Sequence, residues 1–252
     1  MDSGLYAAYT GLMARTQALD TAANNLANAG TIGFRAERDH FASVIAGSLD
    51  QDVNTSSQVG QTVNGFSVLG GSSLDLAQGQ LTATGNPLDL AINGSGFFAL
   101  QTTGGIRYTR DGSFRRSNVG VLESSEHEPV LGTDGKPITI PSGAIHIAAD
   151  GTVSVTTADG SNIAGKVSTV DFVDRSALKA EGANRFAVAD GTKPVASNAT
   201  VQQGSVEGAN EDAIHGTMQL VLVQRQAEMM QKAMSVFNND FDKTATEDLP
   251  RV

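Results

Sequence analysis

Residues 5–26, LYAAYTGLMARTQALDTAANNL, place a leucine at every seventh position. The leucines are Leu5, Leu12, Leu19 and Leu26, and the first three are each followed four residues later by Tyr9, Thr16 and Ala23. This heptad spacing is typical of a helix that packs in a coiled coil. Either Asp2 or Ser3 can cap the N–H groups at the start of such a helix, and Gly30 and Gly33 interrupt the pattern soon after Asn28. The stretch therefore predicts an N-terminal helix with a thin apolar seam.

A second seam lies at the other end of the chain. It consists of Leu220, Ala227, Met234 and Phe241 at seven-residue spacing, with Val223, Met230 and Phe237 three places after the first three. The pattern predicts a helix that begins after Asn210 and ends near Phe241. Between residues 213 and 227 the only ionisable side chains are His215 and Arg225. Because surface helices normally carry more charge, we expect this helix to pack on more than one neighbour.

The region between the two seams has the composition of β-structure. Five Asp-Gly pairs punctuate short apolar runs, and Asp-Gly favours the tight turns of β-hairpins. The expected strands include residues 96–101, 137–140, 144–148 and 152–156. The predicted fold is α+β: helices in 1–30 and 207–252 form a coiled-coil layer, 31–75 is an extended connector, and 76–206 is a central Gly-rich antiparallel β domain.

Composition excludes several classes of function. The formal net charge of −10 is opposite to the basic surface that nucleic-acid binding requires. The chain has no cysteine, so disulfides, thiolate metal sites and thiol nucleophiles are absent. We expect no Sec signal peptide, because residues 1–20 lack a basic segment followed by an apolar one. We also expect no membrane insertion, since no apolar run approaches the ~20 residues of a spanning helix.

The catalytic and cofactor motifs are weak. Residues 94–99, GSGFFA, match a dinucleotide-binding fingerprint, but a strand and a turn are expected after them instead of the helix that would hold the pyrophosphate. The histidines His40, His127, His146 and His215 are scattered, without metal-ligand spacing. We therefore predict no catalytic residue, no metal and no cofactor, and hence a protein that is not an enzyme.

Several stretches together resemble one protein family. Residues 23–35, ANNLANAGTIGFR, are similar to the N-terminal signature of bacterial flagellar rod, hook and hook-filament-junction proteins. The matching positions are Asn24, Asn25, Leu26, Ala27, Asn28, Gly33, Phe34 and Arg35, whereas Gly30 and Ile32 depart. Residues 85–100, GNPLDLAINGSGFFAL, then YTRDGSF at 108–114 and GKPITIP at 135–141, continue the resemblance in the same order.

The resemblance extends to the C-terminal helix. In residues 203–212, QGSVEGANED, the matches are Val206, Glu207 and Asn210, while Gly208, Ala209 and Glu211 depart. Length and the ending DLPRV look most like rod proteins of the proximal type, with the distal type as the alternative. Hook proteins are usually longer.

The resemblance implies a structural protein. Rod proteins are exported through the flagellar type III apparatus, without a cleaved Sec signal, and polymerise with copies of themselves and other rod proteins. They build the hollow periplasmic rod of the basal body, which serves motility by transmitting torque. Assembly would then rest on the helix-packing residues Leu5, Leu12, Leu19, Leu26, Leu220, Val223, Met230, Met234 and Phe237. The thin seams would order only on assembly, because they offset little of the backbone entropy.

Other readings of the residues remain open. The two terminal helices could pair within one monomer, giving a soluble β-rich binding module with a helical stalk. An envelope-associated hydrolase is a further alternative, and it would need an acid–His pair within hydrogen-bond reach on the β domain.

Overall fold

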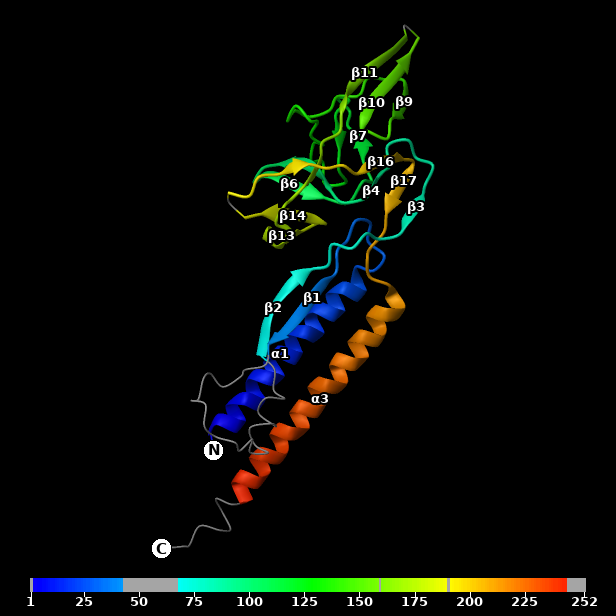
Figure 1. The fold of residues 1–252 in the computed structure, drawn as a ribbon. Helices are drawn as coiled ribbons and strands as arrows, with labels where there is room; N and C mark the ends of the chain where they lie inside the picture. The colour runs from blue at the N-terminus through cyan, green and yellow to red at the C-terminus, as the bar shows by residue number, and fades with distance from the viewer. Residues whose placement is uncertain (1, 43–67, 159, 190, 244–252) are drawn as a thin grey trace, which may run out of the picture. The chain divides into compact units, whose positions relative to one another are not determined.

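The computed structural model describes residues 2–42, 68–158, 160–189 and 191–243 (Figure 1). The chain divides into two compact units. The helix unit contains, among described residues, 2–27, 37–42, 68–73 and 213–243, and the β unit contains 28–36 and 74–212. Most of the predicted connector lies outside the described residues.

The elements follow one another in a simple order. They are α1 Asp2–Ala27, β1 Glu37–Ala42, β2 Val68–Leu74, β3 Leu81–Ala83, β4 Leu90–Asn93, β5 Phe97–Thr102, β6 Gly105–Thr109, β7 Arg115–Arg116, β8 Leu122–Glu123, β9 Ala144–Ile147, β10 Thr152–Thr157, β11 Gly160–Lys166, β12 Thr169–Asp171, the 3-10 turn Arg175–Ala177, β13 Leu178–Gly182, β14 Arg185–Val188, β15 Val195–Ala196, β16 Thr200–Gln203, β17 Ser205–Glu207 and α3 Ala213–Lys243.

In the helix unit, α1 and α3 pack side by side and run in opposite directions (Figure 1). The buried positions of α1 recur every three or four residues, as expected for one face of a helix. They are Gly11, Ala14, Ala18, Ala22 and Asn25, and their counterparts on α3 are Gly216, Val223 and Ala227. Nearly all of these side chains are small, which allows the two backbones to approach closely.

Strand β1 joins this unit through polar contacts with α1. The Asn25 amide donates to the Glu37 carbonyl at 2.8 Å, and its oxygen accepts the Glu37 N–H at 3.0 Å. The Thr21 hydroxyl donates to the Asp39 carboxylate at 3.3 Å. Burial raises the pKa of Asp39, and the hydrogen bond from Thr21 opposes that rise.

The β unit contains several antiparallel sheets. The largest has the order β13-β14-β6-β5-β12-β15, and β9, β10 and β11 form a three-stranded sheet with β10 in the middle. The pairs β16–β4 and β17–β3 bring residues 200–207 back to the beginning of the domain. The last strands of the unit therefore close onto its first strands.

Strand β5 separates two hydrophobic cores. Phe98 and Leu100 belong to one core, with Phe114 and Leu122, while Phe97 and Ala99 face the other. Successive side chains of a strand point to opposite faces, so a strand buried on both faces needs a continuous apolar run. The run Phe97–Leu100 meets that requirement, and Phe98 is 0% exposed.

The structure corrects two sequence predictions. Residues 137–140 form only isolated bridges, in which Pro137 pairs with Leu131 and Thr139 with Val121, instead of a strand. Asp111-Gly112 does not join two paired strands, unlike Asp150-Gly151 between β9 and β10. Gly112 instead lies against the Leu90 carbonyl, where an added Cβ would stand only 1.7 Å from the oxygen. The glycine is needed there for close backbone approach.

The predicted α+β class is confirmed, with one helix at each end and a mostly antiparallel β domain. Among the described helices, none combines the length and the apolar character that a membrane crossing requires.

Candidate functional site

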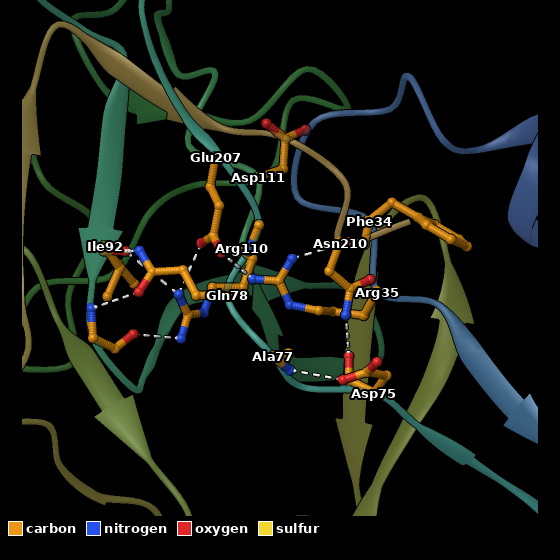
Figure 2. A network of polar contacts seen from close by, with 12 residues as sticks. Phe34, Arg35, Asp75, Ala77, Gln78, Ile92, Arg110, Asp111, Glu207 and Asn210 are labelled. Atoms are coloured by element: carbon orange, nitrogen blue, oxygen red, sulfur yellow. Dashed lines mark hydrogen bonds and ion pairs between the residues drawn. The ribbon is translucent and has the colours of Figure 1, made fainter. Parts of the chain in front are cut away.

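Glu207, the last residue of β17, is the centre of a buried polar network in the β unit (Figure 2). One carboxylate oxygen accepts from Arg35 Nη2 at 2.5 Å and from the Gly79 N–H at 2.8 Å. The other accepts from Arg110 Nη1 at 2.8 Å. Glu207 is 0% exposed, and a buried carboxylate is tolerated only when charge and hydrogen bonds compensate its desolvation.

The two arginines are themselves buried, each 3% exposed. Arg110 also donates to the Gly94 carbonyl at 2.8 Å, and its guanidinium lies 5.3 Å from the centre of the Phe97 ring, a cation–π distance. Burial lowers the pKa of Arg35, and the neighbouring Glu207 carboxylate opposes that effect. The arrangement is an Arg–Glu–Arg triad whose three members come from distant parts of the chain.

Backbone contacts reinforce the triad. The Gly33 N–H donates to the Glu207 carbonyl at 2.7 Å. Gly33 has a φ of +72°, and a Cβ there would lie 2.3 Å from the Asp111 nitrogen. The position therefore requires glycine on two grounds: left-handed backbone and lack of space.

Asn210 connects three chain segments. Its side-chain oxygen accepts the Ala36 N–H at 2.8 Å, and its amide nitrogen donates to the Asp75 carbonyl at 2.6 Å. Asp75 in turn donates its N–H to the Ala36 carbonyl at 2.8 Å. We refer to the complete set as the Glu207 junction: Gly33, Arg35, Ala36, Asp75, Gly79, Arg110, Glu207 and Asn210.

The structure divides the predicted family-motif residues between the two units. Gly33, Phe34 and Arg35 meet Asn210 in the β unit, where the Asn210 N–H donates to the Phe34 carbonyl at 3.4 Å. Asn24, Asn25 and Leu26 belong to α1. Asn28 accepts from both the N–H and the hydroxyl of Thr31 in the turn after the helix, at 2.9 and 3.3 Å.

The predicted helix-packing residues differ in how deeply their side chains are buried. Val223 is buried, and the half-buried set is Leu12, Leu19, Leu26, Leu220, Met230 and Met234. The side chains of Leu5 and Phe237 lie outside the described part of the chain. On α1 the leucines flank the buried glycine and alanines instead of coinciding with them. Their role between subunits stays a prediction.

Sequence reasoning missed the pairing of Arg35 and Arg110 with Glu207. Each residue lies in a stretch that matched the family, but no role followed from that match. A signal was present, because Arg110 and Glu207 directly follow strand residues of an apolar domain and charges there need partners.

Two contacts could suggest hydrolytic chemistry. His127 Nδ1 lies 3.0 Å from the Glu123 carboxylate, and His40 Nε2 lies 2.6 Å from the Ser73 hydroxyl. The His127 side chain is 75% exposed, and Glu123 also pairs with Arg115. The first contact therefore lies on the surface, with a carboxylate that His127 shares with Arg115. His40 and Ser73 are exposed on the β1–β2 ribbon. Among the described residues, no group of three His, Asp or Glu side chains could hold a metal ion.

Comparison with known families gives two matches, one in the N-terminal region and one in the central β unit. Residues 5–35 match the model "Flagella basal body rod protein", and residues 91–155 match "Flagellar hook protein FlgE/F/G D1 domain". Arg35 is the last residue of the first match, and Arg110 lies within the second.

Relatives that match over most of their length are flagellar rod proteins as well. The chain is 33% identical to the flagellar basal-body rod protein FlgF of Caulobacter vibrioides, over 100% of both proteins. It is also 33% identical to FlgF of Mesorhizobium japonicum, over 89% of each, and 30% identical to the rod protein FlgG of Bacillus subtilis, over 88% of this chain and 89% of that protein. These findings confirm the resemblance drawn from residues 23–35 and 85–100. The chain belongs to the flagellar basal-body rod protein family.

Proposed function

We propose that this protein is a structural subunit of the bacterial flagellar basal-body rod, of the FlgF type, and performs no chemistry. The observation that carries the proposal is the similarity to the FlgF of Caulobacter vibrioides, at 33% identity over the full length of both chains. A subunit of the FlgG type is the second candidate, favoured by the similarity to the FlgG of Bacillus subtilis.

In this proposal the terminal helices form the inner coiled-coil layer of a hollow helical tube, and the β unit lies outside it. Support comes from apolar side chains that the helix pair leaves exposed: Tyr9, Met13, Ile214, Met218, Val221, Leu222, Met229 and Val236. Apolar surface of this extent typically marks a protein–protein interface. Contacts that repeat without closing into a ring build a filament.

The proposed partners are further copies of this chain and other rod proteins, together with the flagellar type III export apparatus that would deliver the subunit. The proposed location is the periplasmic rod of the basal body, where the tube would transmit torque. Neither nucleic acid nor membrane is among the expected partners.

Basal bodies isolated from cells provide the direct test. Cells that lack this protein should produce basal bodies with an incomplete rod, and expression of the chain should restore the rod and place the protein in it. Complete rods in the deleted strain would contradict the proposal.

Two substitutions test the helix-packing residues. Leu19→Asp and Met230→Asp each place a charge at a half-buried apolar position, and we expect either to block rod assembly while the β unit stays folded. Gln17→Asp and Gln231→Asp, at exposed positions of the same helices, are the matched controls. Normal rods with Leu19→Asp or Met230→Asp would show that these side chains do not pack between subunits.

Amide exchange on the purified protein distinguishes the proposal from a monomeric binding module with a helical stalk. Ordering on assembly predicts weak protection of residues 2–27 and 213–243 in the free chain. Strong protection of both helices in a monomer would favour the stalk.

A further inference from the structure

Residues 28–36 occupy an unusual place in the chain. They lie between α1 and β1, which both belong to the helix unit, yet they pack as part of the β unit. Along the backbone they reach the rest of the β unit only through residues 37–73. What holds this segment in the β unit is therefore entirely non-covalent.

Most of the hydrogen bonds that join this segment to the rest of the β unit belong to the Glu207 junction. Gly33 and Arg35 bind the backbone and the side chain of Glu207, at 2.7 and 2.5 Å. Ala36 is bound on its N–H by Asn210 and on its carbonyl by Asp75. One contact comes from elsewhere: the Asn184 side chain donates to the Ile32 carbonyl at 2.9 Å.

The chain passes between the two units four times, at 27/28, 36/37, 73/74 and 212/213. On the β side, three of these passages lie within two residues of a junction member, namely Ala36, Asp75 and Asn210. The fourth follows α1, and Gly33 is the first junction member beyond it. One group of side chains and backbone groups in the β unit thus holds three of the four passages directly, and it holds the chain again at Gly33, five residues beyond the passage at 27/28.

We infer that the Glu207 junction is a mechanical anchor that carries force from α1 into the β unit, in parallel with the covalent passage at 212/213. With the junction closed, tension on α1 reaches the β unit at residues 33–36. With it open, residues 28–36 no longer transmit that tension, and along the chain from α1 the next entry into the β unit is at 73/74.

The chemistry of the triad suits an anchor. Separating Arg35 from Glu207 would leave a buried carboxylate with one charged partner fewer in a site without solvent. Such separations are costly, because they leave buried charge without a partner. The inference rests on the proposed function only where it assigns torque as the force; the anchoring itself is a property of the single chain.

Single-molecule pulling on the full-length protein tests it directly. The chain has no cysteine, so Gln17→Cys and Thr156→Cys, both at exposed positions, attach handles specifically to α1 and to the β unit. At constant force, Glu207→Gln should open the segment at least about tenfold faster than the parent, because it removes the buried negative charge. Glu126→Gln, at an exposed site of the β unit, should open at the parent rate.

A second handle pair separates anchoring from general weakening of the domain. With handles at Lys179→Cys and Thr156→Cys, both within the β unit, Glu207→Gln should change the opening rate much less. Equal acceleration with both handle pairs would overturn the inference, as would an unchanged rate with the first pair. The proposed function fails independently, if cells without the protein still build complete rods.

Discussion

The two units solve the packing problem in opposite ways. In the β unit most of the large apolar side chains point inward, and Phe98, Leu90 and Leu122 are all 0% exposed. In the helix unit the inward positions are held by Gly11, Ala14, Ala18 and Ala22, while large apolar side chains such as Met13 and Met229 lie on the surface. Since buried apolar area is the main stabilising term, we expect the β unit to be the more stable of the two and the helix unit to gain stability by packing on a neighbour.

The strongest test of this contrast is a cavity in the β core. Phe98→Ala removes a ring that meets Phe114 edge-on at 5.1 Å, and we expect the free energy of unfolding to fall by about 3–5 kcal/mol. Urea denaturation of the purified protein measures the change. Val119→Ala, where the parent side chain is 80% exposed, should stay within about 0.5 kcal/mol. A small loss for Phe98→Ala would mean that the core is loosely packed.

Gly33→Ala tests the backbone of the Glu207 junction. The left-handed φ and the 2.3 Å approach to Asp111 should cost at least about 1–3 kcal/mol in unfolding free energy. Gly30→Ala is the matched control, because an added Cβ there meets no atom within 4 Å. Equal stability of the two variants would contradict the described path of residues 30–33.

Within the helix unit, Ala18→Leu should overpack the narrow contact between α1 and its neighbours. Ala18 is 4% exposed, so the larger side chain should destabilise the helix pair by about 1–3 kcal/mol, and cells that express this variant should build fewer complete rods than cells with the parent chain. Met13→Leu, on the exposed face of the same helix, should change little. Stabilisation by Ala18→Leu would show that the helices are too far apart for small residues to matter.

The smallest expected effects concern pH, and the two units should differ in sign. Hydrogen bonds from the Thr152 N–H and hydroxyl, and then from Lys166, lower the pKa of Asp150 to about 2. Against an unfolded value of ~3.9, this carboxylate stabilises the fold above that pH, and the contribution is lost as pH falls toward 2. Burial raises the pKa of Asp39, so its ionised form destabilises the folded state. Protonation at lower pH removes this destabilising contribution.

Unfolding curves of the parent, Asp150→Asn and Asp39→Asn across this acidic range test the signs. The advantage of the parent over Asp150→Asn should shrink as pH falls. The free energy of unfolding of the parent should be lower than that of Asp39→Asn, and this difference should also shrink as pH falls. Parallel curves at every pH would contradict both assignments.

Much of the fold was visible in local patterns. The seven-residue spacing predicts both helices to within a few residues of Asp2–Ala27 and Ala213–Lys243, because helical periodicity is a property of neighbouring residues. The apolar run around β5 and the Asp150-Gly151 turn are local signals too. Residues 137–140 look like a strand but form only isolated bridges, since pairing depends on what lies opposite.

The sequence predicted separate parts of the candidate site but not how they come together. Arg35 and Glu207 are 172 residues apart, and Arg110 and Glu207 are 97 apart, so no periodicity connects them. Their motifs were identified, but the pairing is a tertiary fact. The buried face of α1 was not predicted either, because the heptad pattern indicates the leucines as packing residues whereas Ala14, Ala18 and Ala22 are the more deeply buried ones.

The closing strands have a consequence for the order of events during synthesis. Strand β16 pairs with β4, and Val201 lies opposite Ile92, so the β unit remains open at one side until residues beyond 200 have emerged. A nascent or partly transported chain cannot finish this domain early, because its final strands and the Glu207 carboxylate arrive near the end. Long-range pairing of this kind slows folding. The topology thus delays completion of the β unit until residues 200–207 are available to pair.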